Sequence, residues 1–329
     1  MEGELARVCA QQGGFVLRWQ ALACGYSDDA IASKLRGKEW IRLRRGAYAV
    51  AAHWQRLDPG QRHVLIFRAA AARLDGQVVA AGPTALAALG VPLWGVALDT
   101  IHVHREEVRS SRTEAGVAHH PGALATDEIR EVDGLLVAAP ARAIVDAARI
   151  VSFETGVVLA DGTRRLFLPQ ADEAMEVLER QRDWPGSIQA SRVLKFSDGR
   201  AATVGESRGR VMIARLGLPA PDLQRRIVGG RGELIAITDY YFDGFDTAGE
   251  FDGRLKYGRE LYETSNRHDE DVDLGDVVWR EKRREDAVRD EGNEMVRVVW
   301  HELDGHDGPV RARFLRAFGR ATRMRRQAT

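Results

Sequence analysis

The sequence has 329 residues, which is too long for one ordinary domain and predicts two or three. Its 48 basic and 48 acidic side chains cancel, so the total charge does not by itself indicate a nucleic-acid partner. No apolar run approaches the length of a membrane span and the start does not resemble a signal peptide, so we expect no membrane partner and a cytoplasmic location. The two cysteines, Cys9 and Cys24, are not spaced like a zinc site or a disulfide framework.

The first segment of the chain alternates short helical patterns with glycine stops. Helices are predicted over 5–13, 18–24 and 27–37, and Ser27 is a good N-cap for the third. A two-stranded ribbon over 39–50 follows, turning at Arg44-Arg45-Gly46. Three short helices followed by a basic hairpin are typical of a winged helix-turn-helix.

Two stretches of this segment resemble the N-terminal domain of AbiEi-type antitoxins of type IV toxin–antitoxin systems. They are Ala21-Leu22-Ala23-Cys24-Gly25-Tyr26-Ser27 and Arg42-Leu43-Arg44-Arg45-Gly46-Ala47-Tyr48. The resemblance implies a DNA-binding module and a cognate toxin protein as a partner. Protein contact alone is the alternative, and Asp28 and Asp29 argue against deep insertion of the third helix into the major groove. The basic side chains that we expect to contact phosphates are Lys34, Arg36, Lys38, Arg42, Arg44 and Arg45.

The middle region, residues 56–198, has the pattern of an α/β region. Helices are predicted over 61–73, 82–90 and 140–149, with a strand over 100–105. The stretches Pro83-Thr84-Ala85-Leu86 and Pro140-Ala141-Arg142-Ala143-Ile144-Val145-Asp146 resemble the region that follows the winged helix in AbiEi-like chains.

Two histidine pairs in this region could in principle bind a metal. His102 and His104 share one face of the predicted strand, and His119 and His120 are adjacent. No cysteine or acidic residue stands at a ligand-like spacing from them. We therefore interpret all four as structural or surface histidines.

The last region, residues 199–329, contains an acidic hairpin. The predicted strand 234–242 is followed by the loop Asp243-Gly244-Phe245-Asp246, whose Asp-Gly pair tolerates positive φ. Side chains alternate along a strand, so Glu250 and Asp252 should share a face, and antiparallel pairing should bring Asp239 beside them. Close carboxylates repel unless a pKa rises or a hard cation binds. With Lys256 nearby, the pattern predicts Mg²⁺ or Mn²⁺ and phosphodiester hydrolysis.

The same residues resemble the PD-(D/E)xK nuclease core of DUF559-type and very-short-patch-repair-like proteins. The likeness rests on Asp239, on Glu250-Phe251-Asp252-Gly253 and on Lys256, with the helix at Gly205-Glu206 before them and an arginine-rich helix after them. It implies that Asp239, Glu250 and Asp252 bind the metal, that Glu206 completes its shell and that Lys256 assists the attacking water. It also implies contacts to the substrate backbone from Arg283, Arg284 and Arg289. The sequence departs from the pattern at Asp252, where the family has lysine.

The sequence therefore predicts a multidomain α+β chain. Its expected parts are a winged helix-turn-helix (1–55), a middle AbiEi-like α/β domain (56–198) and a restriction-endonuclease-like α/β domain with a basic C-terminal helix (199–329). Two functions stay open. One is a nucleic-acid-binding protein of toxin–antitoxin or defence type with a Mg²⁺-dependent nuclease domain, and the other is a non-catalytic AbiEi-like antitoxin or transcriptional repressor.

Overall fold

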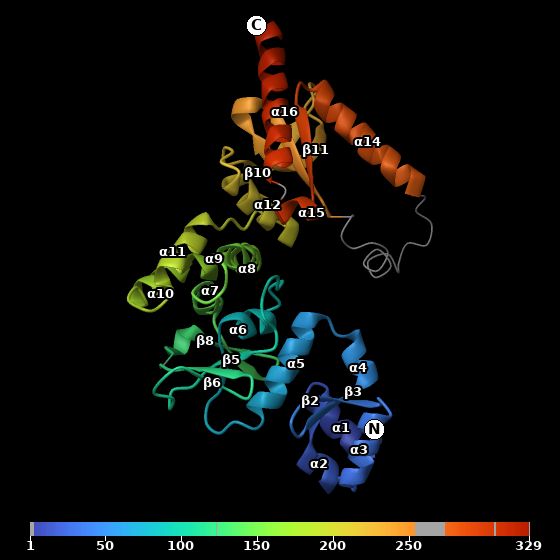
Figure 1. Ribbon diagram of the computed structural model, residues 1–329, viewed down its shortest axis with the longest axis vertical. Helices are drawn as coiled ribbons and strands as arrows, with labels where there is room; N and C mark the ends of the chain where they lie inside the picture. The colour runs from blue at the N-terminus through green and yellow to red at the C-terminus, as the bar shows by residue number, and fades with distance from the viewer. Residues whose placement is uncertain (1–2, 123, 254–273, 306, 329) are drawn as a thin grey trace. The chain divides into compact units, whose positions relative to one another are not determined.

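The computed structural model describes residues 3–122, 124–253, 274–305 and 307–328 (Figure 1). Over these ranges the protein is a mixed α+β molecule containing three separate sheets, so the predicted α+β class is confirmed. The chain divides into two compact units, Met1–Ser197 and Asp198–Thr329. The winged-helix and endonuclease-like assignments stay predictions.

The first unit begins with short helices around a small antiparallel sheet whose strand order is β1-β3-β2. Ser27 caps the third helix as predicted, because its hydroxyl accepts the N–H of Ala30 at 3.1 Å. The elements are α1 (Gly3–Gln11), β1 (Phe15–Leu17), α2 (Arg18–Ala23), α3 (Asp28–Arg36), β2 (Trp40–Arg44), β3 (Ala47–Val50), α4 (Ala51–Arg56) and α5 (Pro59–Ala71).

Both faces of this sheet are covered. Leu5 of α1 and Ile31 of α3 pack with Trp40 in one apolar cluster. Leu65 and Ala69 of α5 pack with Phe15, Leu17 and Ala47 in another. Helix α5 also packs against α6 (Gly82–Ala88). Helix α5 therefore packs on both the N-terminal sheet and a helix of the middle region. The predicted domain boundary near residue 55 stays a prediction.

The rest of the first unit is a six-stranded mixed sheet with helices packed on it (Figure 1). The strand order is β6-β7-β5-β4-β9-β8, in which β5 runs parallel to β7 and β4 parallel to β9. Every residue of α7 is buried, including two charged ones that are discussed below. The elements are β4 (Val79–Ala80), β5 (Ile101–His104), β6 (Arg112–Glu114), β7 (Val117–His120), β8 (Ile129–Val132), β9 (Leu135–Ala138), α7 (Pro140–Ala148), α8 (Phe153–Leu166), α9 (Leu168–Asp172), α10 (Ala174–Arg180) and α11 (Ser187–Phe196).

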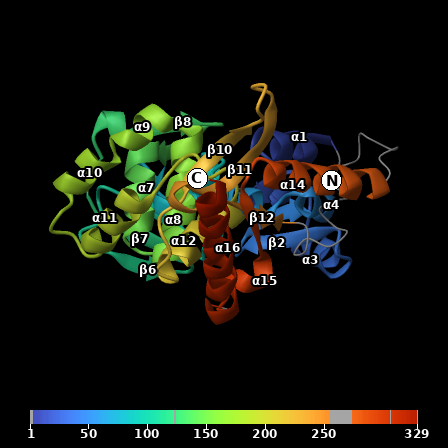
Figure 2. The same cartoon turned by 90° about the horizontal axis from the view of Figure 1, so that it is seen from above.

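The second unit is a four-stranded sheet, in the order β10-β11-β12-β13, between two layers of helices. Helices α12 and α16 cover one face, where Phe314 and Phe318 of α16 pack against Phe242. On the other face, Val288 of α14 packs on Met295, and Figure 2 shows α14 and α16 diverging around the strands. The elements are α12 (Val204–Arg215), β10 (Asp222–Val228), β11 (Leu234–Phe242), β12 (Thr247–Asp252), α14 (Leu274–Asp290), β13 (Glu294–Val299), α15 (Trp300–Leu303) and α16 (Asp307–Ala328).

The predicted acidic hairpin is present, but its turn is built differently from our expectation. The left-handed residue is Asp246, with a φ of 37°, and not Gly244. Its carboxylate accepts a hydrogen bond from Arg325 at 2.6 Å, and its carbonyl oxygen accepts the N–H of Glu294 at 2.8 Å. These two contacts hold Asp246 in a conformation that aspartate tolerates better than most residues. Lys256 lies outside the described residues.

Two further arginines of α16 bind carboxylates of the same unit. Arg313 pairs with Glu302 at 2.7 Å, and Arg320 pairs with Glu294 at 2.7 Å. Each pair is made by two parallel hydrogen bonds, which is the strongest geometry for arginine and carboxylate. The basic helix therefore contributes to the fold of the second unit.

Because the second unit has its own core, a fragment containing residues 198–329 should fold without the rest of the chain. We expect a single cooperative thermal transition by far-UV circular dichroism. A fragment that stays soluble only when the first unit is attached would show that the boundary is wrong.

Candidate functional site

Asp239 and Glu250 lie where β11 and β12 separate. Tyr240 pairs with Gly249, and continuing this antiparallel register by one residue sets Asp239 opposite Glu250. The N–H of Phe251 donates to Oδ2 of Asp239 at 2.7 Å, so a carboxylate extends the ladder between the strands. Both acids are therefore held by regular backbone structure.

Glu206 reaches the same region from the start of α12. Thr203 is the N-cap, and its hydroxyl accepts the N–H of Glu206 and donates to Oε1 of Glu206. The N–H of Ala202 and the side-chain amide of Gln224 donate to Oε2 at 2.8 and 3.0 Å. A Thr-x-x-Glu sequence forms such caps without any ligand, so local structure explains the position of Glu206. Its assignment to a metal shell stays a prediction.

Two arginines face Glu250, whose exposed fraction is only 7%. Nη2 of Arg284, on α14, donates to Oε1 at 2.7 Å. Arg297 stands beside Glu250 in the parallel register of β13, with 3.9 Å to Oε2, and lies 3.8 Å from Asp252. A buried carboxylate needs such partners because isolated burial of a charge is unfavourable. The sequence analysis did not single out Arg297.

The described residues do not fit a divalent cation in this arrangement. Among them, no three His, Cys, Asp or Glu side chains come together in a way that could hold a metal ion. Two guanidinium groups face Glu250 and Asp252, and the oxygens of Glu206 accept hydrogen bonds from its own helix cap and Gln224. The metal site at Asp239, Glu250 and Asp252 therefore stays a prediction.

The three arginines that we expected to hold a substrate backbone differ in their surroundings. Arg284 binds Glu250, and Arg289 pairs with Glu285 on its own helix at 2.6 Å. Arg283 is exposed. Ion pairs within the unit thus account for the positions of Arg284 and Arg289.

Burial raises the pKa of Asp239 to about 6. The N–H of Phe251 and the charge of Arg284 lower this pKa, and the charge of Glu206 raises it. Since the folded-state pKa lies above the ordinary value, the native state keeps a proton that the unfolded chain has already released. Stability should therefore fall as the pH rises from about 4 to about 6, and stay lower above that window.

Asp239→Asn should remove this pH-dependent loss of stability. We expect the variant to match the wild type near about pH 4 and to exceed it above about pH 6, by at most about 3 kcal/mol. Asparagine keeps an oxygen to accept the N–H of Phe251. Urea midpoints across this range would measure the effect, with Asp243→Asn, an exposed carboxylate of the same hairpin, as the control. A stability difference that does not change with pH would contradict the assignment.

In the first unit, a β-bulge separates the basic side chains of the ribbon. Arg42 pairs with Tyr48 and Arg44 with Ala47, so Leu43 is an extra residue and the alternation of side chains is broken. Arg44 accordingly donates to the carbonyl oxygen of Ala115 at 2.6 Å. The sequence predicted Arg42, Arg44 and Arg45 as one cluster. In the structure Arg44 lines a second hollow, which Arg45 shares, and not the one that Arg42 lines.

Arg42 and Arg45 line a pocket of about 530 Å³, which we call the arginine pocket. Within the described ranges neither side chain makes a hydrogen bond or an ion pair, and both are exposed. Trp19, which is 64% exposed, lines the same pocket. The other basic members, which were not among the predicted residues, are Arg18 of α2 and Arg73, which follows α5. The arginine pocket is lined by Leu17, Arg18, Trp19, Arg42, Arg45, Gly46, Tyr48 and Arg73.

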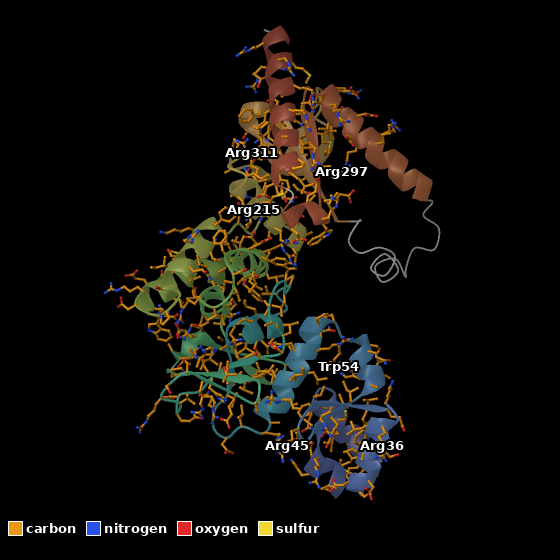
Figure 3. The ribbon with its side chains drawn as sticks, viewed as in Figure 1. Arg36, Arg45, Trp54, Arg215, Arg297 and Arg311 are labelled. Atoms are coloured by element: carbon orange, nitrogen blue, oxygen red, sulfur yellow. The ribbon has the colours of Figure 1, made fainter. Side chains whose placement is uncertain are left out.

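The remaining predicted phosphate contacts lie elsewhere. Lys34 pairs with Glu39 at 2.6 Å, whereas Arg36 and Lys38 are exposed. Figure 3 shows Arg36 and Arg45 on opposite sides of the N-terminal part of the chain. The six predicted residues therefore do not form one surface.

The histidines of the middle region need a correction. His104 and His119 are buried, with exposed fractions of 3% and 4%, so the surface alternative is wrong for both. His104 also has an acidic partner, because its Nε2 lies 2.8 Å from Oδ2 of Asp146. The two residues are 42 positions apart, and no spacing rule finds such a pair.

Taken together, these features define a mixed α+β protein with an arginine pocket in one unit and an acidic cluster neutralised by arginines in the other. No family model matches the chain. It is similar to an uncharacterized protein of Mycobacterium tuberculosis strain CDC 1551 / Oshkosh and to an uncharacterized protein of strain ATCC 25618 / H37Rv. Each is 28% identical over 255 residues, which cover 76% of this chain and 87% of the relative. An alignment of this length must extend into both units.

No helix in the described part of the chain combines the length and the apolar character needed to cross a membrane.

Proposed function

We propose that the protein binds duplex DNA as a regulator of the antitoxin or repressor type, and that its second unit binds without cutting. The observation that carries the proposal is the arginine pocket. Arg42 and Arg45 are exposed cations with no acidic partner among the described residues, and an exposed indole, Trp19, lies beside them. Guanidinium groups that no carboxylate neutralises are suited to phosphate oxygens.

The surrounding elements support a winged helix-turn-helix as the DNA-binding module. Three helices, α1 to α3, precede the antiparallel pair β2 and β3, whose connecting turn carries Arg45. This is the order of elements in which a recognition helix is followed by a basic wing. The pocket lies between the wing and α2, so phosphate contact would orient the module on the duplex.

In the second unit, the order of elements supports the endonuclease-like fold that the resemblance implies. Helix α12 precedes three antiparallel strands, and α14 crosses over to the parallel strand β13. The arginines on Glu250 favour a unit that keeps this fold without binding a metal. A toxin protein as partner, which the AbiEi resemblance implies, and the cytoplasm as compartment, which we expect from the sequence, belong to the same proposal.

A second candidate function is metal-dependent phosphodiester hydrolysis. One observation favours it: Glu206, Asp239 and Glu250 reach one region from three elements, and the pKa of Asp239 is raised to about 6. Perturbed carboxylates of this kind gather at catalytic sites. A cation there would have to displace Arg284 from Glu250.

Titration of a short labelled duplex, first with chelator and then with Mg²⁺ or Mn²⁺, tests the proposal and separates the two candidates. We expect binding at low salt that does not depend on the metal, followed by intact strands on a denaturing gel. Cleavage that requires metal and disappears in Glu250→Gln would establish the second candidate. A lack of binding at low salt would refute the proposal itself.

A further inference from the structure

A second pocket of the first unit, of about 700 Å³, is unrelated to the arginine pocket. It opens at the carboxyl ends of the parallel strands β5 and β7, where His104 and His120 stand side by side in the register. Small-molecule sites have this size, and in open α/β sheets they lie beyond the carboxyl ends of strands. Asp146, Arg149, Ile150 and Trp184 complete the part of the lining that matters here.

A buried charged network supports the floor of this pocket. Oδ2 of Asp146 accepts hydrogen bonds from Nε2 of His104 and from Nε of Arg142, both at 2.8 Å. Arg142 also donates to Glu128 at 3.1 Å. Arg142 and Asp146 are one turn apart on α7, so a single apolar helix carries both charges into the core. Burying such a network costs desolvation free energy, and its hydrogen bonds fix the side chains in position.

One acceptor of this network, Oδ1 of Asp146, has no hydrogen-bond partner among the described residues. Burial raises the pKa of Asp146, but the hydrogen bond from His104 and the charge of Arg142 outweigh burial and lower it, so the side chain is a carboxylate. Oδ1 of Asp146 has no hydrogen-bond donor in the described part of the chain, although Arg149 lies 3.5 Å from it. Buried acceptors without a donor are unfavourable.

The charges around the pocket favour a neutral ligand. Burial and neighbouring charges lower the pKa values of His102 and His120 to about 4, so both rings are neutral near pH 7. Arg142 faces Glu128, and the partly buried Arg149 faces Asp146. Asp183, which also lines the pocket, lies 3.6 Å from Arg182. Each of these charges therefore has an opposite charge beside it.

The mouth of the pocket is apolar and flat. Trp184 is 38% exposed and Ile150 is 49% exposed, so both offer apolar surface at the pocket. The guanidinium group of Arg149 stacks over the indole ring of Trp184 at 4.8 Å and holds it in place. Gly186, with a φ of 85°, lets the backbone pass so close to Arg149 that a side chain would clash there. A fixed indole at the mouth of a pocket suits a planar ring.

We propose that this pocket binds a neutral, planar nitrogen heterocycle of nucleobase size. Its ring stacks on Trp184, and an N–H group donates to Oδ1 of Asp146. This small-molecule site goes beyond the proposed binding of duplex DNA, and it stands or fails independently of that function.

A matched pair of probes tests the chemistry of the site in the full chain. In 9-methyladenine the 6-amino group carries the only N–H bonds, and in its 6-dimethylamino counterpart none remain. We expect 9-methyladenine to bind one-to-one by titration calorimetry and to raise the melting temperature. The dimethylamino compound should bind at least about tenfold more weakly, because the loss of a hydrogen bond to a charged group is worth about 1.5–3 kcal/mol.

Variants test the location. Trp184→Ala should abolish binding of 9-methyladenine, Trp184→Phe should retain most of it, and Trp19→Ala, which removes an indole from the arginine pocket, should leave it unchanged. Circular dichroism checks that each variant is folded. No heat and no thermal shift with 9-methyladenine would overturn the proposal. So would equal binding of the two probes, or full binding to folded Trp184→Ala.

Discussion

Arg142→Ala should destabilise the first unit by about 3–5 kcal/mol, which is a large part of the stability of an ordinary domain. Arg142 is 3% exposed, and its guanidinium group bonds to both Asp146 and Glu128. Its removal leaves two carboxylates in a region that excludes water. The loss therefore comes mainly from the uncompensated charges, and the measurement is the shift of the urea midpoint of the full chain.

Arg180→Ala is the matched control for this prediction. Arg180 pairs with the same Glu128 at 2.9 Å, but 57% of its side chain is exposed. An exposed pair contributes about 0–1 kcal/mol. Equal midpoint shifts for Arg142→Ala and Arg180→Ala would show that burial does not govern the network as we describe it.

The second large effect concerns DNA. Replacing Arg42 and Arg45 together with alanine should weaken the binding of a duplex by roughly one to two orders of magnitude near about 0.1 M salt, since two phosphate contacts are lost. Both side chains are exposed and have no acidic partner in the described part of the chain, so the fold should tolerate the change. Fluorescence anisotropy with a labelled duplex measures it.

The control for the arginine pocket removes the same charge elsewhere. Arg182 and Arg231 are exposed on 69% and 92% of their side chains and lie outside the pocket. Arg182→Ala/Arg231→Ala should therefore bind duplex DNA almost as the wild type does. Equal losses in the two double variants would mean that total charge, and not the pocket, determines affinity.

Local signals in the sequence predicted the local structure. Ser27 before two acids predicted a helix start, and the structure has that helix and its cap. The acidic hairpin also followed from alternation and a turn signal, although Asp246 and not Gly244 takes the left-handed conformation. These features depend on neighbours in the chain, which a sequence displays directly.

What the sequence could not show depends on one extra residue or on distant partners. The bulge at Leu43 turns Arg44 away from Arg42. A run of basic residues in a sequence does not predict such a bulge. Arg297 meets Glu250 because β13 pairs in parallel with β12, a register set only by the folded sheet. An acidic cluster in a sequence thus predicts a metal site equally well whether or not distant arginines neutralise it.

The central claim is that the arginine pocket binds the DNA backbone. The slope of log K against log salt for duplex binding, measured for the wild type and for Arg42→Ala/Arg45→Ala, tests it most directly. Each lost phosphate contact lowers the slope by about 0.9, so the account predicts a slope that is smaller by about 2 in the variant. An unchanged slope in Arg42→Ala/Arg45→Ala would contradict the account.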